Sequence, residues 1–177
     1  MTVIRRFSGI NYIGAAVAKA DKDSLVFVFD VDSTLTHDPD RTIVYPSKED
    51  YFDAAHSFSP NYQMLNYARR FVRDGHRVAI ATARPPRYLE QTIEWLEQHN
   101  VPFDQIMLST GDLPSSVAKQ EMILDLQHYY KRVAYLYDDS PYNIEGAALQ
   151  GVPGRQLKTN CQYWRDNPEE VVPLGVI

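Results

Sequence analysis

The apolar run from Leu25 to Phe29 constrains the fold most, because it ends in two carboxylates at alternate positions, Asp30 and Asp32. A continuous apolar run of this length is typical of a buried parallel strand. Ligands of open α/β sheets bind outside the carboxyl ends of the strands. Two acids at such an end indicate a bound cation, a proton transfer, or both. The alternative interpretation is that they only cap the following turn.

Further apolar runs alternate with helical patterns along the chain. The expected strands are residues 25–30, 77–82, 105–108, 133–137 and 155–158. The expected helices are one capped by Ser59-Pro60 and closed by Gly75, one over 87–99, one over 116–129, and one beginning at Ser140-Pro141. Strands that alternate with helices predict an α/β fold, a Rossmann-like open parallel sheet with helices on both faces.

The chain has 177 residues, 44% of them hydrophobic and 23% charged, which predicts one soluble globular domain. Its net charge of −5 provides no overall attraction to nucleic acid, although a local basic patch stays compatible with it. Cys161 is the only cysteine, which excludes a disulfide framework and an all-cysteine metal site.

The N-terminal segment loosely imitates a secretory signal, with Arg5-Arg6 ahead of a mildly apolar stretch. Its middle is too polar for that role, so we expect it to pack on the domain as a strand or a helix. No apolar run approaches the length of a membrane span. We therefore expect a cytoplasmic protein with no membrane partner, and the sequence leaves its oligomeric state open.

One segment, from Thr36 to Phe58, separates the first strand from its helix and does not follow the alternation. Structureless stretches of this length are uncommon unless they serve as a lid or a binding loop, and this one is too short for a second domain. Its aromatic residues Tyr45, Tyr51 and Phe52 can stack on a base or form a small core of the insert itself.

Three more segments place polar groups at strand or helix ends. Thr82 and Arg84 follow the second strand just before a helix, which suits an oxyanion such as a phosphoryl group. Lys119 opposes the dipole in the first turns of its helix, so it either serves a site or is an exposed lysine. Asp138 and Asp139 end another strand, and beside a second acidic pair they require a cation such as Mg²⁺.

Taken together, these motifs resemble those of haloacid dehalogenase superfamily phosphatases. They are Asp30-Val31-Asp32-Ser33-Thr34, Thr82, Lys119 and Asp138-Asp139, and they span roughly residues 25–158. Single motifs of this kind are weak, but four in one order on matching elements are specific. The resemblance implies a Mg²⁺-dependent phosphatase made of one domain, residues 1–177, with a short cap insert at 36–58.

The resemblance also implies roles for individual residues. Asp30 matches the nucleophile that forms an aspartyl-phosphate, and Asp32 matches the general acid that protonates the leaving oxygen and later activates water. An acid at position 32 favours phosphoryl transfer over dehalogenation. Thr82 corresponds to the residue that hydrogen-bonds a phosphoryl oxygen. Lys119 corresponds to the lysine that neutralises charge on the nucleophile.

The implied metal ligands are Asp30, Asp32 through its carbonyl, Asp138, and Asp139 either directly or through water. The segments that follow the two strands supply the implied substrate-binding groups. These are Ser33, Thr34, Thr82, Ala83 and Arg84.

A closer resemblance is to the phosphatase lobe of bifunctional polynucleotide kinase/phosphatases. It rests on Thr82-Ala83-Arg84, on the short insert, and on Lys119 followed by Glu121. It implies removal of 3′-phosphates from nucleic-acid ends, with Arg84 contacting the substrate phosphate. No phosphate-loop sequence of a kinase occurs in the chain. The alternatives are a mononucleotide or small-metabolite phosphatase, or a catalytically silent binding protein of the same fold.

A basic cluster from Arg69 to Arg77 also permits a nucleic-acid interpretation. Its arginines lie largely on the polar side of their expected helix, so a solvated helix face is the competing interpretation. Arg84 and Arg87, beside the second motif, are the better candidates for a substrate contact.

Overall fold

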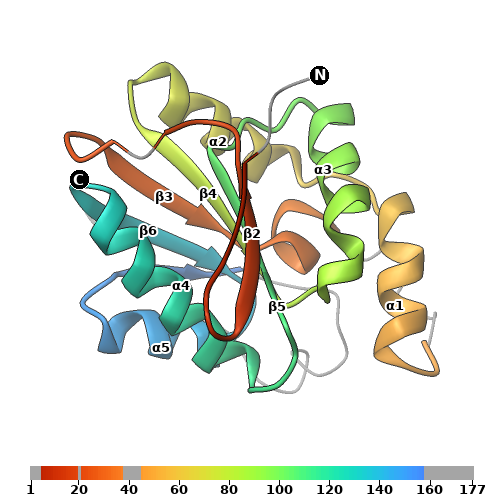
Figure 1. Ribbon diagram of the computed structural model, residues 1–177. Coiled ribbons are helices and arrows are strands. Elements are labelled where there is room, and N and C mark those ends of the chain that lie inside the picture. The colour runs from red at the N-terminus through yellow and green to blue at the C-terminus, as the bar shows by residue number, and fades with distance from the viewer. Residues whose placement is uncertain (1–4, 20, 38–44, 158–177) are drawn as a thin grey trace.

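The structure is a computed structural model that describes residues 5–19, 21–37 and 45–157 (Figure 1). Its strands are β1 (Arg5–Ser8), β2 (Tyr12–Ala16), β3 (Leu25–Phe29), β4 (Arg77–Thr82), β5 (Gln105–Ser109), β6 (Arg132–Asp138) and β7 (Gly154–Gln156). Its α-helices are α1 (Lys48–Ala54), α2 (Tyr62–Arg73), α3 (Leu89–Gln98), α4 (Ser115–Tyr129) and α5 (Pro141–Leu149).

The strands form one sheet in the order β1-β2-β5-β4-β3-β6-β7. The five strands from β5 to β7 in this order are parallel, which confirms the predicted open α/β sheet. The N-terminal segment adds an antiparallel hairpin, with β1 paired to β2 and β2 paired to β5. β3, which carries the first acidic motif, therefore lies between β4 and β6, which carry the second and the fourth.

Helices cover both faces of the sheet, and the alternation along β3 shows how. Phe27 and Phe29 pack in a core with residues of α2 and α3, whereas Val26 and Val28 pack in a second core with residues of α4 and α5. Successive side chains of a strand point to opposite faces, so both faces of β3 must be apolar. Figure 1 shows α4 and α5 together on one side of the sheet.

The predicted start of the first long helix is wrong by two residues. α2 begins at Tyr62 after Asn61, because Pro60 lies in extended backbone and forms an isolated bridge with Thr36. The predicted start of α5 is confirmed: the Ser140 hydroxyl accepts a hydrogen bond from the Asn143 N–H, and Pro141 is the first helical residue.

The insert forms α1 and a short turn, Ala55–Ser57, where the sequence predicts only a lid or a binding loop. α1 lies beside α3 in Figure 1. The Tyr88 hydroxyl, one residue before α3, donates a 2.6 Å hydrogen bond to Asp53 of α1. Residues 38–44 of the insert, Lys158 at the end of the last expected strand, and Cys161 lie outside the described residues. Among the described helices, none is long and apolar enough to span a membrane.

Candidate active site

The end of β3 places Asp30 at the carboxyl edge of the sheet. The Asp30 N–H donates to the Tyr137 carbonyl of β6, which extends the pairing of the two strands by one residue. The chain then turns tightly, and the Thr36 N–H donates to the Val31 carbonyl. Ser33 within this turn has a φ of 60°, a left-handed conformation that non-glycine residues rarely adopt. Strained backbone of this kind concentrates at functional sites.

Three carboxylates meet at this edge. One oxygen each of Asp30, Asp138 and Asp139 lies within 4.8 Å of the others. Asp30 and Asp138 are buried, and Asp139 is partly exposed. β3 and β6 are neighbours in the parallel sheet, so their carboxyl ends bring together acids that are more than 100 residues apart. Hard carboxylate oxygens in this number suit Mg²⁺, so the donor set fits the ion that the sequence predicts.

Lys119 is the positive charge among these acids. Its Nζ donates to Asp30 Oδ1 at 2.7 Å and to Asp138 Oδ2 at 2.5 Å. The side chain is 2% exposed, so the interpretation of Lys119 as an exposed lysine is wrong. One lysine offsets only one of three carboxylates, and the surplus negative charge is the electrostatic signature of a cation site.

The close approach of these charges shifts the pKa values of the groups in the cluster. Burial, together with the charges of Asp138 and Asp32, raises the pKa of Asp30 to about 7 although Lys119 opposes the shift. Burial and the charge of Asp30 also raise the pKa of Asp139 above its usual range. Burial disfavours the charge on Lys119, but Asp138 and Asp30 outweigh it and raise the pKa of the lysine. Without a cation, the raised pKa values of Asp30 and Asp139 therefore favour the protonated form of these two carboxyls more than usual.

Asn143 is a site residue that the sequence analysis did not single out. Its Nδ2 donates to both carboxylate oxygens of Asp138, at 3.0 and 3.1 Å, and the Ser140 N–H donates to the same carboxylate at 2.9 Å. These bonds hold Asp138 in place from the first turn of α5. The signal in the sequence is weak, because an asparagine two residues after a capping Ser-Pro is common in helices without a site.

The second motif surrounds the other acid. Arg84 donates to both oxygens of Asp32, with Nε to Oδ2 at 2.9 Å and Nη2 to Oδ1 at 2.7 Å. The Arg84 side chain is fully buried, and it is not among the residues that line the cavity described below. Thr82 is also buried and accepts a hydrogen bond from the Arg84 N–H at 3.2 Å. Asp32 therefore lies between the cavity and a buried guanidinium.

The remaining residues of the first two motifs lie around the same point. Thr34 is buried, and its hydroxyl donates to Asp30 Oδ2 at 3.4 Å. Ser33 and Ala83 line the cavity into which Asp30 and Asp32 open. The described structure thus places the sequence-predicted site residues around one centre, and their chemical roles stay predictions.

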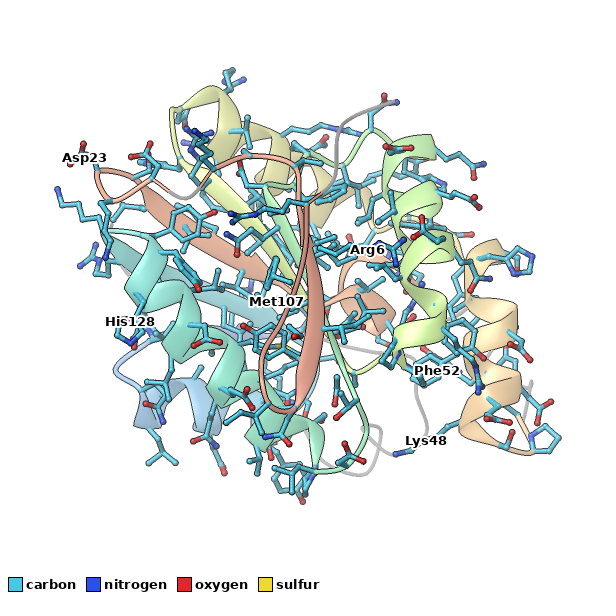
Figure 2. All side chains as sticks on the ribbon, in the orientation of Figure 1. Arg6, Asp23, Lys48, Phe52, Met107 and His128 are labelled. Carbon is cyan, nitrogen blue, oxygen red and sulfur yellow. The ribbon has the colours of Figure 1, made fainter. Side chains whose placement is uncertain are left out.

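The cavity has a volume of about 530 Å³ and lies between the acids and the insert. Its floor includes Asp30, Asp32, Lys119 and Asp139. One wall comes from α1 and consists of Lys48, Glu49, Tyr51 and Phe52; the facing wall comes from the segment between β5 and α4 and includes Ser109, Gly111, Leu113, Pro114 and Ser115. Figure 2 shows Lys48 at the start of α1 and Phe52 on the side of α1 that faces α3.

Of the two roles that the sequence left open for the aromatic residues of the insert, the structure shows the small core, and stacking on a base stays a prediction. The ring of Tyr51 lies 5.3 Å from that of Tyr45 and 5.1 Å from that of Phe58, so these residues form a small core. Tyr51 and Phe52 also line the cavity, where an aromatic face is available to a ligand.

The basic cluster on α2 is engaged within the protein. Arg69 donates to the carbonyls of His99 and Asn100 at the end of α3, at 2.6 and 3.0 Å. Arg70 and Arg73 both lie 3.5 Å from Asp74, and they are largely exposed. These contacts support the solvated-face interpretation. Arg87, which the sequence predicts as a candidate substrate contact, donates a hydrogen bond to Glu49 of α1 at 2.8 Å.

Comparisons with known proteins agree with this geometry. A chain of the Pnkp1/Rnl/Hen1 RNA repair complex superimposes with a TM-score of 0.63 at 22% identity, over 79% of this chain and 45% of that chain. A protein described as a HAD-like phosphatase from Mesorhizobium loti superimposes with a TM-score of 0.61 at 17% identity, over 94% and 85% of the two chains. This chain has the fold of haloacid dehalogenase-like phosphatases.

A third structure with this fold is the D,D-heptose 1,7-bisphosphate phosphatase from B. bronchiseptica, complexed with magnesium and phosphate. Its TM-score is 0.55 at 15% identity, over 85% of this chain and 89% of that one. At these identities the likenesses show the fold alone, and the present chain spans about half the length of its Pnkp1/Rnl/Hen1 match. The chemistry must therefore be argued from the site.

In sequence, no family model matches the chain. One curated protein, the human membrane-associated phosphatidylinositol transfer protein 3, is 24% identical over 110 residues. The match covers 56% of this chain but only 11% of that protein, so it concerns a small part of the human chain.

Proposed function

We propose that this protein is a Mg²⁺-dependent phosphomonoesterase that acts through an aspartyl-phosphate on Asp30. The observation that carries the proposal is the meeting of Asp30, Asp138 and Asp139 with a single buried lysine, Lys119, at the floor of a cavity. A purely structural role does not explain three carboxylates that share one cation in a buried place.

The reaction has two steps. An oxygen of the Asp30 carboxylate attacks phosphorus and forms the acyl-phosphate bond, while the bond from phosphorus to the ester oxygen breaks. The leaving oxygen takes the proton of the Asp32 carboxyl. A water molecule then gives a proton to Asp32 and attacks phosphorus, the acyl-phosphate bond breaks, and inorganic phosphate and the Asp30 carboxylate are released. Asp32 ends the cycle protonated, as it began.

Asp30, Asp138 and Asp139, with the carbonyl of Asp32, would hold the magnesium ion. When bound, the ion supplies electrostatic stabilisation of the charge on the transferring phosphoryl group. Lys119 places its ammonium on the nucleophile and neutralises charge that the acids would otherwise concentrate there. Ser33, Thr34, Thr82 and Ala83 are the proposed phosphate-binding groups, because they surround Asp30 at the ends of β3 and β4.

The proposed substrates are nucleotides or nucleic-acid 3′-phosphate ends. Two observations support them: the likeness to a chain of the Pnkp1/Rnl/Hen1 RNA repair complex, and the cavity wall formed by Lys48, Tyr51 and Phe52. A lysine beside two aromatic rings suits a base and a further phosphate. The alternative is a small phosphorylated metabolite, since a heptose bisphosphate phosphatase has the same fold. We also propose that residues 1–177 form one domain, with 36–58 as its cap insert.

The test is phosphate release from a panel of substrates, with and without Mg²⁺. The panel contains a 3′-phosphorylated oligonucleotide, nucleoside 3′- and 5′-monophosphates, and sugar phosphates, and Asp30→Asn serves as the control. Preference for the oligonucleotide supports end processing, whereas preference for mononucleotides or sugar phosphates keeps the mechanism and removes the nucleic-acid role. Absence of release from all of them favours the catalytically silent binding protein.

A further inference from the structure

A path of hydrogen bonds, continued through the covalent frame of Tyr88 from its carbonyl to its hydroxyl, joins the insert helix α1 to the acid Asp32. We propose that Thr92 and Tyr88 are positioning residues that make the orientation of the Asp32 carboxyl depend on the docking of α1. The proposal rests on the proposed function, in which Asp32 donates the proton to the leaving group.

The first link is the fork between Arg84 and Asp32. Two parallel hydrogen bonds of 2.9 and 2.7 Å fix the plane of the carboxylate as well as its position. The Arg84 side chain is fully buried, while that of Asp32, which lines the cavity, is 14% exposed. A protonated carboxyl keeps acceptor capacity, so Arg84 can hold Asp32 in both of its protonation states.

The second link is Thr92 of α3, which sets the position of the guanidinium. Its hydroxyl accepts from Arg84 Nη1 at 3.0 Å and donates to the Tyr88 carbonyl one turn earlier at 2.7 Å. Thr92 is fully buried, so water cannot replace either bond without a change in packing. The hydroxyl therefore transmits the position of the residue at the start of α3 to Arg84.

The third link joins Tyr88 to the insert. The Tyr88 hydroxyl donates to Asp53 of α1 at 2.6 Å, and its ring lies 5.7 Å from that of Phe52. Arg87 donates both to the Tyr88 hydroxyl at 3.0 Å and to Glu49 of α1 at 2.8 Å.

Glu49 and Phe52 also line the cavity beside Asp32. A helix that forms the cavity wall is thus linked, through the exposed carboxylate of Asp53 and then the buried Tyr88, Thr92 and Arg84, to the acid on the cavity floor. When α1 is docked, the path holds the Asp32 carboxyl toward the cavity; when α1 is displaced, the position of Arg84 loses part of its support.

The test exploits the fact that only some leaving groups need a proton. A nucleoside 3′-phosphate expels an alkoxide and depends on the acid, whereas p-nitrophenyl phosphate expels a stable phenolate. The quantity to compare is kcat/KM, because it reports the steps up to the departure of the leaving group. Thr92→Val keeps the shape of the side chain and removes the hydroxyl.

We expect Thr92→Val to lower kcat/KM for the nucleoside 3′-phosphate by about tenfold, part of the 10²–10⁴-fold that a general acid supplies, and that for p-nitrophenyl phosphate by less than about threefold. Thr92→Ser restores the hydroxyl and should restore the ratio of the two values. Loss of folded protein lowers both values equally, so the ratio separates positioning from stability.

Tyr88→Phe tests the link to α1 without touching the buried threonine. We expect a selective loss in the same direction, smaller than that of Thr92→Val. The matched control is Tyr130→Phe, which removes a buried tyrosine hydroxyl that has no hydrogen-bond partner among the described residues. It should leave the ratio unchanged.

Equal losses on both substrates in Thr92→Val, or a wild-type ratio in both Thr92→Val and Tyr88→Phe, would overturn the inference and leave the proposed function standing. Failure of the wild-type protein to hydrolyse either substrate would overturn the proposed function first. The two failures are distinguished before any variant is made.

Discussion

Two clusters of charge lie at opposite ends of β4 and its neighbours, and each has one base between two acids. At the carboxyl edge Lys119 bridges Asp30 and Asp138. At the other end of β4, Arg77 bridges Asp21 and Asp104, at 3.3 and 3.2 Å. The pattern of contacts is the same, but the surroundings differ.

The Arg77 cluster is partly exposed to solvent, and neutral hydrogen-bond donors bind both of its acids. The Arg77 side chain is 36% exposed, against 2% for Lys119. Asp104 accepts a further hydrogen bond from the Val78 N–H, and Asp21 accepts one from the Ser24 hydroxyl. Solvent screens such a cluster, and its contribution to stability is small.

The Lys119 cluster, in contrast, holds a third carboxylate, that of Asp139, and its lysine and the carboxylates of Asp30 and Asp138 are buried. A buried surplus of like charge lowers stability unless a ligand compensates it. The comparison teaches that burial of the surplus negative charge, not the presence of an ion pair, distinguishes a site from a structural cluster.

The largest expected effect comes from Asp30→Asn. Removal of the nucleophile should lower kcat by at least about 10³-fold, because an amide cannot form the acyl-phosphate.

The matched change at the other cluster, Asp104→Asn, should keep kcat within about twofold and lower the free energy of unfolding by about 1–2 kcal/mol, since it weakens the bonds to Arg77 and Val78. Steady-state kinetics and chemical denaturation measure the two effects. Comparable losses of activity in both variants would break the comparison.

Lys119→Met should be next in size. It leaves the buried acids without their base, so we expect a loss of about 3–5 kcal/mol in the metal-free protein, together with a loss of about 10²-fold or more in kcat. Arg77→Met, at the screened cluster, should cost about 1 kcal/mol or less and leave kcat unchanged. Denaturation in the presence of a chelator provides the first number. Equal destabilisation by the two variants would show that burial does not separate the clusters.

Binding of Mg²⁺ should stabilise the protein by an amount that increases with the logarithm of the ion concentration above Kd. At a concentration of about 100 times Kd, the gain is about 2.7 kcal/mol, which corresponds to a rise in Tm on the order of 5–10 °C for a chain of this size. Asp139→Asn should abolish most of the rise, whereas Asp104→Asn should retain it. The measurement is a thermal melt with and without the ion. A rise that survives Asp139→Asn would place the cation elsewhere.

The smallest effect is a pH dependence of opposite sign at the two clusters. The pKa of Asp30 is raised from 3.8 to about 7, so its contribution to stability is complete below about pH 4 and is lost as pH rises through about 7. The hydrogen bond from Ser24 lowers the pKa of Asp21, so that carboxylate contributes above its ordinary pKa and loses the contribution as pH falls.

The metal-free protein should therefore lose on the order of 1–2 kcal/mol between roughly pH 5 and 8. Asp30→Asn should reduce this loss, because the amide does not ionise, and Asp139, whose pKa is also raised, should account for what remains. Melting curves recorded across this range in a chelator test the sign, and a stability that increases toward pH 8 would contradict it.

The alternating apolar runs sufficed to predict the α/β sheet, since a fully apolar run such as Leu25 to Phe29 can be buried only between two layers of helices. The same reasoning placed Asp30, Thr82 and Asp138 at one edge, because parallel strands end together. The start of α2 was mispredicted, because the bridge of Pro60 to Thr36 is a contact between distant segments that no local preference encodes.

The sequence by itself thus determined which strands end in polar motifs, the order of these motifs along the chain, and the residue types at the site. Only the tertiary structure decided that Lys119 is buried between Asp30 and Asp138. It also decided that the Arg84 guanidinium binds Asp32 instead of being exposed to solvent. The physical reason is that the state of a charge depends on its burial and its neighbours in space. Those neighbours come from other strands and helices, and a local pattern in the chain carries no record of them.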